Sequence, residues 1–162
     1  MTKLMTAFSA TACLIALFVF TFLSTHAFAH GEDKPGPHGG FVQMPGAFHT
    51  ELVLVDKNLF EVYLLDMDFK NPTTENSSVK AIFTDSKKRV AEFTCDASGT
   101  KFVCTIPKHM TSKGFDLRKE AKAKIALTAT RGANKGHTMT YELPLKHKAP
   151  EENHSGHGGH HH

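Results

Sequence analysis

Short apolar segments recur along the chain, and turn-rich stretches separate them. Within these segments apolar residues alternate with polar ones or run continuously, and β-branched and aromatic residues are frequent, which is typical of β-strands. About seven strands with little helical periodicity predict an all-β fold, an antiparallel β-sandwich of the immunoglobulin-like or cupredoxin-like type. Only the segment FDLRKEAK, at 115–122, could form a turn or two of helix. The pattern predicts strands at 48–55, 59–66, 78–84, 89–95, 101–106, 123–130 and 137–143.

The first 29 residues carry a different pattern, with one lysine near the start, a continuous apolar run at 13–23, and small residues at Ala27 and Ala29. This arrangement is typical of a secretory signal peptide. Because the apolar run is shorter than the roughly 20 residues of a membrane-spanning helix, we expect cleavage of residues 1–29 and no permanent membrane anchor. Cleavage after Ala29 makes His30 the N-terminus, although a site after Ala27 is also acceptable. The expected location is periplasmic or secreted.

The remaining residues, 30–162, suffice for one domain with a sizeable core. We expect a flexible segment rich in His, Gly and Pro at 30–40, a β-sandwich at 41–146, and a disordered His-rich tail at 147–162 that is native or partly a purification tag. Without Lys3, the 19 basic residues of the chain fall to 18, against 16 acidic ones. This near balance argues against nucleic acid as a partner, because domains that bind nucleic acid concentrate basic residues on one face.

Cys95 and Cys104 are the two cysteines outside the signal peptide. They lie in two β-prone segments that flank a turn-forming stretch at 96–100, so a hairpin would bring them close together. Exported chains meet an oxidising compartment, and we therefore predict one cross-strand disulfide rather than a pair of thiolates that binds zinc or copper. Without a free cysteine ligand, a blue-copper electron carrier is disfavoured.

Histidine is frequent in the predicted exported chain, which keeps 11 of the 12 histidines once His26 is removed. A flexible polyhistidine segment gathers Ni(II), Cu(II) or Zn(II) without setting a geometry. It therefore argues for metal handling without naming the metal. The tail holds five of these histidines: His154, His157, His160, His161 and His162.

A more specific signal lies at the start of the first predicted strand, where His49 and Glu51 are two residues apart. Side chains two apart on a strand share a face, so these two point the same way. If the strand returns through a tight turn that sets Val55 opposite Leu59, Glu51 lies opposite Tyr63. A cluster of polar side chains is then expected at one end of the sandwich.

Other candidate ligands could join His49 and Glu51 in this cluster. In the same register Met67 is a near diagonal neighbour of His49, and Met44 and the loop from His30 to His38 could reach the same end. A terminal His30 would offer both an α-amine and an imidazole. Imidazole, thioether and amine donors suit copper in either oxidation state, with zinc or nickel possible, whereas Mg(II) and Ca(II) need more carboxylates.

The same residues have a purely structural interpretation. His49 could be an exposed edge residue, Glu51 a solvated side chain and Met67 part of the core. Asp66 and Asp68, which flank Met67, could form a turn or support a ligand histidine by a hydrogen bond. Both interpretations stay open at the level of sequence.

A second candidate metal site combines the dipeptide His109-Met110 in a loop with His137 and Met139, which share one strand face. Each pair offers an imidazole and a thioether, which are copper-compatible ligands. Met139 shares its face with apolar neighbours, however, so core packing is the competing interpretation.

The run Pro-His-Gly-Gly at 37–40, followed by Gly-Ala-Phe-His-Thr-Glu-Leu-Val-Leu at 46–54, resembles the His-Gly-Gly…His-x-Glu-Leu-Val signature of periplasmic segments of heavy-metal (copper/zinc) efflux adaptor proteins and their small exported relatives. The resemblance implies a periplasmic metal-binding β-domain. The positions that match the motif are His38, His49 and Glu51.

The resemblance extends to about residue 68, with one departure. Relatives often read Asp-His-Asp where this chain has Met67 between two aspartates, which favours Cu(I) or removes a ligand. Nothing in the sequence resembles the adaptors' long helical hairpin or lipoyl-like portion, so we do not expect a complete adaptor.

The leading hypothesis is an exported metal-binding protein, not an enzyme, that buffers copper or passes it to a periplasmic efflux or copper-assembly protein. Two alternatives stay open: a copper enzyme with a histidine brace at His30, and an exported interaction module with incidental metal affinity. The absence of Trp and the presence of only Tyr63 and Tyr141 disfavour a surface that acts on polysaccharides. No Ser-His-Asp or Cys-His nucleophile pattern is present.

Overall fold

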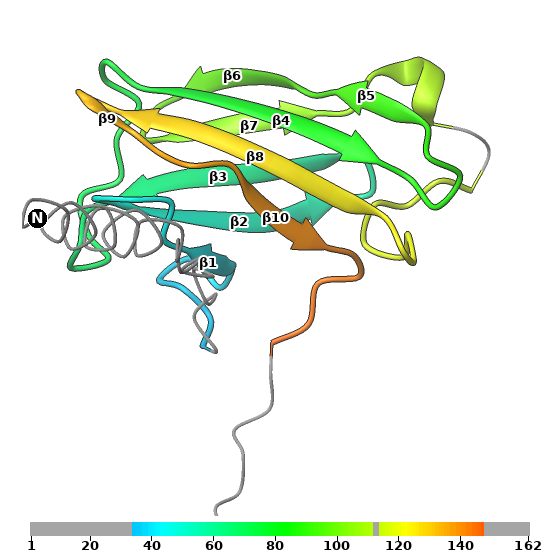
Figure 1. The fold of residues 1–162 in the computed structure, drawn as a ribbon, viewed down its shortest axis with the longest axis horizontal. Helices are drawn as coiled ribbons and strands as arrows, with labels where there is room; N and C mark the ends of the chain where they lie inside the picture. The colour runs from blue at the N-terminus through cyan, green and yellow to red at the C-terminus, as the bar shows by residue number, and fades with distance from the viewer. Residues whose placement is uncertain (1–33, 112–113, 148–162) are drawn as a thin grey trace, which may run out of the picture.

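The computed structural model describes residues 34–111 and 114–147 and shows an antiparallel β-sandwich. Two five-stranded sheets face one another (Figure 1). The predicted all-β class is therefore confirmed, although the described residues form ten strands rather than about seven. The predicted signal peptide, His30 and the five tail histidines lie outside the described residues. Within the described ranges no helix is long and apolar enough to cross a membrane.

The first sheet has the strand order β1-β2-β3-β7-β6, and the second has the order β10-β8-β4-β5, with β9 paired to β8. The strands of the first sheet are β1 (Phe41–Gln43), β2 (His49–Asp56), β3 (Leu59–Leu65), β7 (Lys101–Thr105) and β6 (Thr94–Ser98). The strands of the second are β10 (Met139–Glu142), β8 (Lys124–Arg131), β4 (Ser78–Thr84), β5 (Val90–Glu92) and β9 (Asn134–Lys135).

The three additional strands have identifiable causes. β1 and β9 hold three and two residues, too few for an alternating pattern to be recognised. The predicted strand 89–95 is split into β5 and β6, because the chain passes from one sheet to the other at Phe93. The backbone N–H of Phe93 still bonds to Ala81 in the second sheet, whereas Thr94 already pairs with Thr105 in the first.

The connection from β7 to β8 is the largest local departure from prediction. Residues 115–122 contain turns instead of the suggested helix, and a 3-10 turn, η2 (Lys108–Met110), precedes them. Asp116 accepts hydrogen bonds from the backbone and guanidinium of Arg118, while Leu117 donates its N–H to Lys57 and buries its side chain completely. The backbone N–H groups of Leu117 and Arg118 thus have acceptors without the formation of a helix. The Arg118 side chain is also the main cause that lowers the pKa of Asp116 to about 2.

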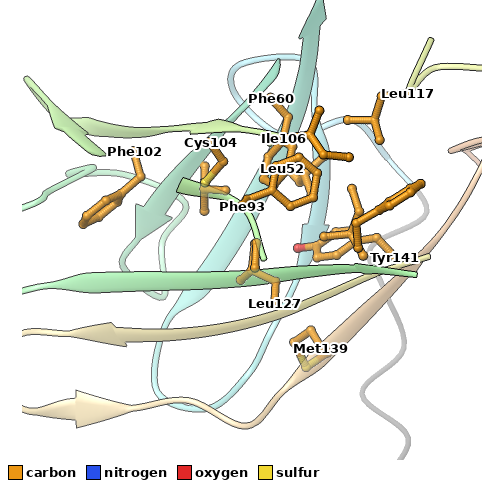
Figure 2. Close-up of a cluster of buried hydrophobic side chains, with 14 of the residues drawn as sticks. Leu52, Phe60, Phe93, Phe102, Cys104, Ile106, Leu117, Leu127, Met139 and Tyr141 are labelled. Carbon is orange, nitrogen blue, oxygen red and sulfur yellow. The ribbon is translucent and has the colours of Figure 1, made fainter. Parts of the chain in front are cut away.

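The core lies between the two sheets, where alternate strand residues point inward. On β2 and just before it, Phe48, Thr50 and Leu52 are fully buried. Figure 2 shows part of the core, in which side chains of the first sheet, such as Leu52 and Phe60, and of the second, such as Leu127, belong to one cluster. Each such apolar side chain contributes about 1.5–3 kcal/mol by burial. The alternation that predicted the strands therefore also predicted which faces form the core.

The predicted disulfide joins β6 to β7. Cys95 lies directly opposite Cys104 in the register, their Cα atoms are 4.0 Å apart, and the two sulfur atoms are bonded. Cys104 is fully buried on the apolar side of its strand, beside Phe102. The disulfide prediction is confirmed.

Candidate metal site

The outer face of the first sheet carries the residues that the sequence singled out. β2 pairs with β3 so that Glu51 lies opposite Tyr63 and His49 opposite Leu65, as predicted. The predicted anchor of this register is wrong, because Asp56 rather than Val55 faces the first residue of β3, after an irregularity near the turn. Although His49 and Glu51 point away from the core, only 3% and 0% of their surfaces are exposed.

Glu51 fixes the segment that precedes β1. Its Oε1 accepts hydrogen bonds from the backbone N–H groups of His38 and Gly40, each at 2.8 Å, and its Oε2 lies 2.8 Å from Nδ1 of the His38 ring. Hydrogen bonds to a carboxylate are roughly twice as strong as neutral ones. Residues 36–40, predicted to be flexible, therefore form a tight turn on β2.

Two glycines allow this close approach. A Cβ atom added to Gly40 would lie 2.5 Å from the carbonyl oxygen of Leu52, and one added to Gly36 would lie 2.6 Å from the Glu51 carboxylate and from Val42. Any side chain at either position would collide with these atoms. Gly36 and Gly40, of which Gly40 belongs to the His-Gly-Gly motif, thus allow this turn to pack against β1 and β2.

The His38 ring is oriented on two sides. It stacks on the Tyr63 ring at 3.7 Å between centroids and 7° between planes, and Glu51 holds its Nδ1. Tyr63 in turn donates its hydroxyl to Glu61, which also accepts a hydrogen bond from Lys101. Burial opposes the ionisation of Glu61, but the hydrogen bonds from Lys101 and Tyr63 outweigh it and lower its pKa. The Tyr63 ring that stacks on His38 is therefore held by the ionised carboxylate of Glu61, which is hydrogen-bonded through both of its oxygens.

The hydrogen bond to Glu51 determines which nitrogen of His38 is available. A carboxylate only accepts hydrogen bonds, so Nδ1 of the neutral ring carries the hydrogen and Nε2 keeps its lone pair. The side chain of His38 is 32% exposed. An imidazole that donates one N–H to a carboxylate and offers the other nitrogen is the usual arrangement of a metal-binding histidine.

His49 shows the same arrangement with a different acceptor. Its Nδ1 lies 3.0 Å from the backbone oxygen of Asp66, and its ring stacks on Phe69 at 4.0 Å. A carbonyl oxygen also only accepts, so Nδ1 again carries the hydrogen and Nε2 is the free nitrogen. Within the described residues Nε2 of His49 has no hydrogen-bond partner. Two imidazoles with fixed orientation thus lie on one face of the sheet.

The turn after β3 shows the role of Asp66, for which the sequence left two interpretations open. The Asp66 side chain accepts hydrogen bonds from the backbone of Asp68 and Lys70 and from the amide of Asn71. The bond from Lys70 is the largest of the causes that lower the pKa of Asp66. Asp66 therefore forms the turn with its side chain and supports His49 with its backbone carbonyl. Met67 lies in this turn with 51% of its surface exposed.

The residues of the second predicted site are not brought together. Met110 and Met139 lie in the core, with 5% and 9% of their surfaces exposed. His109 follows β7, near the β2–β3 turn, whereas the backbone of His137 bonds to Pro45, before the start of β2. The two histidines therefore lie near opposite ends of β2 (Figure 1), a strand of eight residues that spans about 23 Å.

In the part of the chain that the structure describes, no three His, Cys, Asp or Glu side chains are grouped closely enough to hold a metal ion. Among the described residues predicted as ligands of this site, His38 and His49 offer Nε2 and Met67 offers its thioether. Glu51 has both oxygens occupied and is fully buried, so its position is that of an orienting group rather than a ligand. His30 and the tail histidines lie outside the described residues.

Sequence analysis missed the aromatic partners of both histidines. Tyr63 was expected opposite Glu51, but its stacking on His38 depends on where the preceding loop folds back. Phe69 reaches His49 because its backbone adopts a positive φ of 61° within the turn, a conformation that no local pattern indicates for Phe. No protein-family model, curated protein or solved structure matches this chain.

Proposed function

We propose that this protein is an exported metal-binding protein that holds copper on the outer face of its first sheet. The observation that carries the proposal is the matched arrangement of His38 and His49. Each ring has its Nδ1 bound to an oxygen acceptor and one aromatic ring stacked against it, which leaves Nε2 as the donor atom. Such outer hydrogen bonds orient histidine ligands and raise their basicity.

The donor set favours copper over hard cations. The carboxylates that hold the two histidine segments in place, Glu51 and Asp66, are occupied by N–H donors, whereas the imidazole nitrogens and the thioether of Met67 are neutral donors. Mg(II) and Ca(II) require several oxygen ligands, whereas imidazole and thioether suit copper, with zinc or nickel as competitors for the imidazoles. In the proposal, Met67 and a terminal His30 complete the coordination.

The proposed role is buffering or delivery by ligand exchange, without catalysis. The tail histidines would collect the ion, and a site with few ligands could release it to a periplasmic efflux or copper-assembly protein. The signal-like N-terminus and the Cys95–Cys104 disulfide support an oxidising compartment as the place of action. The His-Gly-Gly…His-x-Glu-Leu-Val resemblance supports the same role.

The test uses the full exported chain in a background where the tail cannot bind metal. Copper and zinc are titrated by competition with chromophoric chelators, and His49→Ala is compared with His147→Ala. His147 is a suitable control because it is also partly buried and stacked, on Phe41 at 3.9 Å. The background replaces five residues with alanine: His154, His157, His160, His161 and His162.

We expect one tight copper equivalent, which His49→Ala weakens more than about tenfold while His147→Ala leaves it unchanged. Urea unfolding of both variants separates a loss of binding from a loss of fold. Equal effects of the two substitutions, or no tight copper binding in the tail-substituted chain, would contradict the proposed site.

A further inference from the structure

Two exposed methionines come just after the strands that flank β2, the strand of His49. In the described part of the chain, the large hydrophobic residues with exposed side chains are Met44 (42%), Val55, Met67 (51%) and Val90. The remaining described methionines, at positions 110 and 139, are buried in the core. The side chains of Met44 and Met67 therefore gain less burial energy than those of the two buried methionines.

Met44 directly follows the last residue of β1. β1 pairs with β2 so that Val42 faces Glu51 and Gln43 faces Thr50, and a continuation of this register past the end of β1 sets Met44 opposite His49. Val42 and Glu51 share the outer face, because a Cβ added to Gly36 would meet both of them. Met44, two residues after Val42, falls on that same face by the alternation of a strand.

Met67 approaches His49 from the other side. The carbonyl that accepts the hydrogen bond of His49 Nδ1 belongs to the peptide group between Asp66 and Met67. β1 and β3 flank β2 on opposite sides in the sheet (Figure 1), so the two methionines bracket the histidine. The methionine side chain has three rotatable bonds and adapts readily to a ligand position.

We propose that Met44 and Met67 join Nε2 of His49 to form a site selective for Cu(I). This inference rests on the proposed function and specifies the oxidation state of its metal. Thioether sulfur is a soft ligand that selects Cu(I) over Cu(II) and Zn(II), whereas imidazole serves all three ions. The carboxylate of Asp66, the residue whose carbonyl bonds to His49, is occupied by three N–H donors.

The experiment compares Met44→Leu, Met67→Leu and Met139→Leu in the full chain with the tail histidines replaced. Leucine keeps the size of methionine and removes the sulfur, and the buried Met139 serves as the control. Cu(I) affinity is measured by competition with a chromophoric Cu(I) chelator, without thiol reductants so that the disulfide stays intact. Cu(II) affinity is measured separately in air.

We expect each of the two exposed substitutions to lower Cu(I) affinity at least about tenfold, with Cu(II) affinity and the control variant unchanged. If the parent chain binds Cu(I) tightly and neither Met44→Leu nor Met67→Leu changes this, the Cu(I) site is refuted while the proposed function stands. If the parent chain binds neither Cu(I) nor Cu(II), both fail together.

Discussion

Replacement of Glu51 by Gln tests how the His-Gly-Gly turn and the histidine orientation depend on one carboxylate. Gln has the shape of Glu, so no cavity is created, and its carbonyl oxygen can still accept the backbone N–H groups of His38 and Gly40. Its amide NH₂ then faces Nδ1 of His38, where it would meet another N–H. The clash is relieved only if the His38 hydrogen moves to Nε2, which removes the free lone pair of the ring.

Glu51→Gln should lower both the unfolding free energy and the copper affinity. Hydrogen bonds to a charged group contribute about 1.5–3 kcal/mol each and neutral ones about 0.5–1.5 kcal/mol. Each of the three bonds therefore loses about 1–1.5 kcal/mol, and together they cost about 3–4.5 kcal/mol of unfolding free energy. A domain with ordinary stability of about 5–15 kcal/mol stays folded. The loss of one oriented imidazole lowers copper affinity about 10–100-fold.

Three measurements on Glu51→Gln address these values: urea unfolding, chelator competition for copper, and the tautomer of His38 by nitrogen-15 NMR of the imidazole. Glu92→Gln is the matched control, because Glu92 is a β-strand residue whose side chain is 59% exposed and pairs with the exposed Lys80. A surface pair of this kind contributes about 0–1 kcal/mol.

Two results would contradict this role of Glu51: Glu51→Gln retains the stability of the parent protein, or His38 keeps its hydrogen on Nδ1 while copper affinity falls. The first result would mean that the buried carboxylate does not hold the turn. The second would mean that the tautomer of His38 does not control binding.

Three further outcomes are expected. Gly40→Ala should cost about 1–3 kcal/mol through its collision with β2 and weaken copper binding. Gly46→Ala should do neither, because its added Cβ would lie at an ordinary contact distance of 4.0 Å from the carbonyl oxygen of Lys135; equal urea midpoints of the two variants would contradict this. Replacement of both Cys95 and Cys104 by alanine should lower the unfolding free energy by about 2–3 kcal/mol, because the bridge closes a loop with a sequence separation of only 9; an unchanged urea midpoint would argue against it. The pKa of Asp116 is about 2 in the folded chain, below its ordinary value of 3.8, so the unfolded state binds more protons between these values. The contribution of Asp116 to the unfolding free energy is therefore lost as the pH falls from about 4 to 2. Asp116→Asn should remove that part of the pH dependence, and identical urea midpoints of both proteins across this range would disprove it.

Much of the fold follows from local patterns. Period-two alternation identified most strands and the inward side of β2, because one face of a sandwich strand must be apolar whatever its partners are. The turn between Cys95 and Cys104 predicted their pairing for a similar reason, since nine residues of hairpin leave few arrangements. The passage of the chain between sheets at Phe93 left no such trace, because Phe packs equally well in either sheet.

The candidate site was likewise predicted from the sequence only in part. The spacing of His49 and Glu51 determined that both point to one face, and the pairing with β3 brought Tyr63 opposite Glu51. That Glu51 is enclosed by N–H donors depends on a turn that comes from outside the strand and closes on it. Hydrogen bonds between residues far apart in sequence require the assembled sheet, so only the tertiary structure decided which nitrogen of each histidine is free to bind.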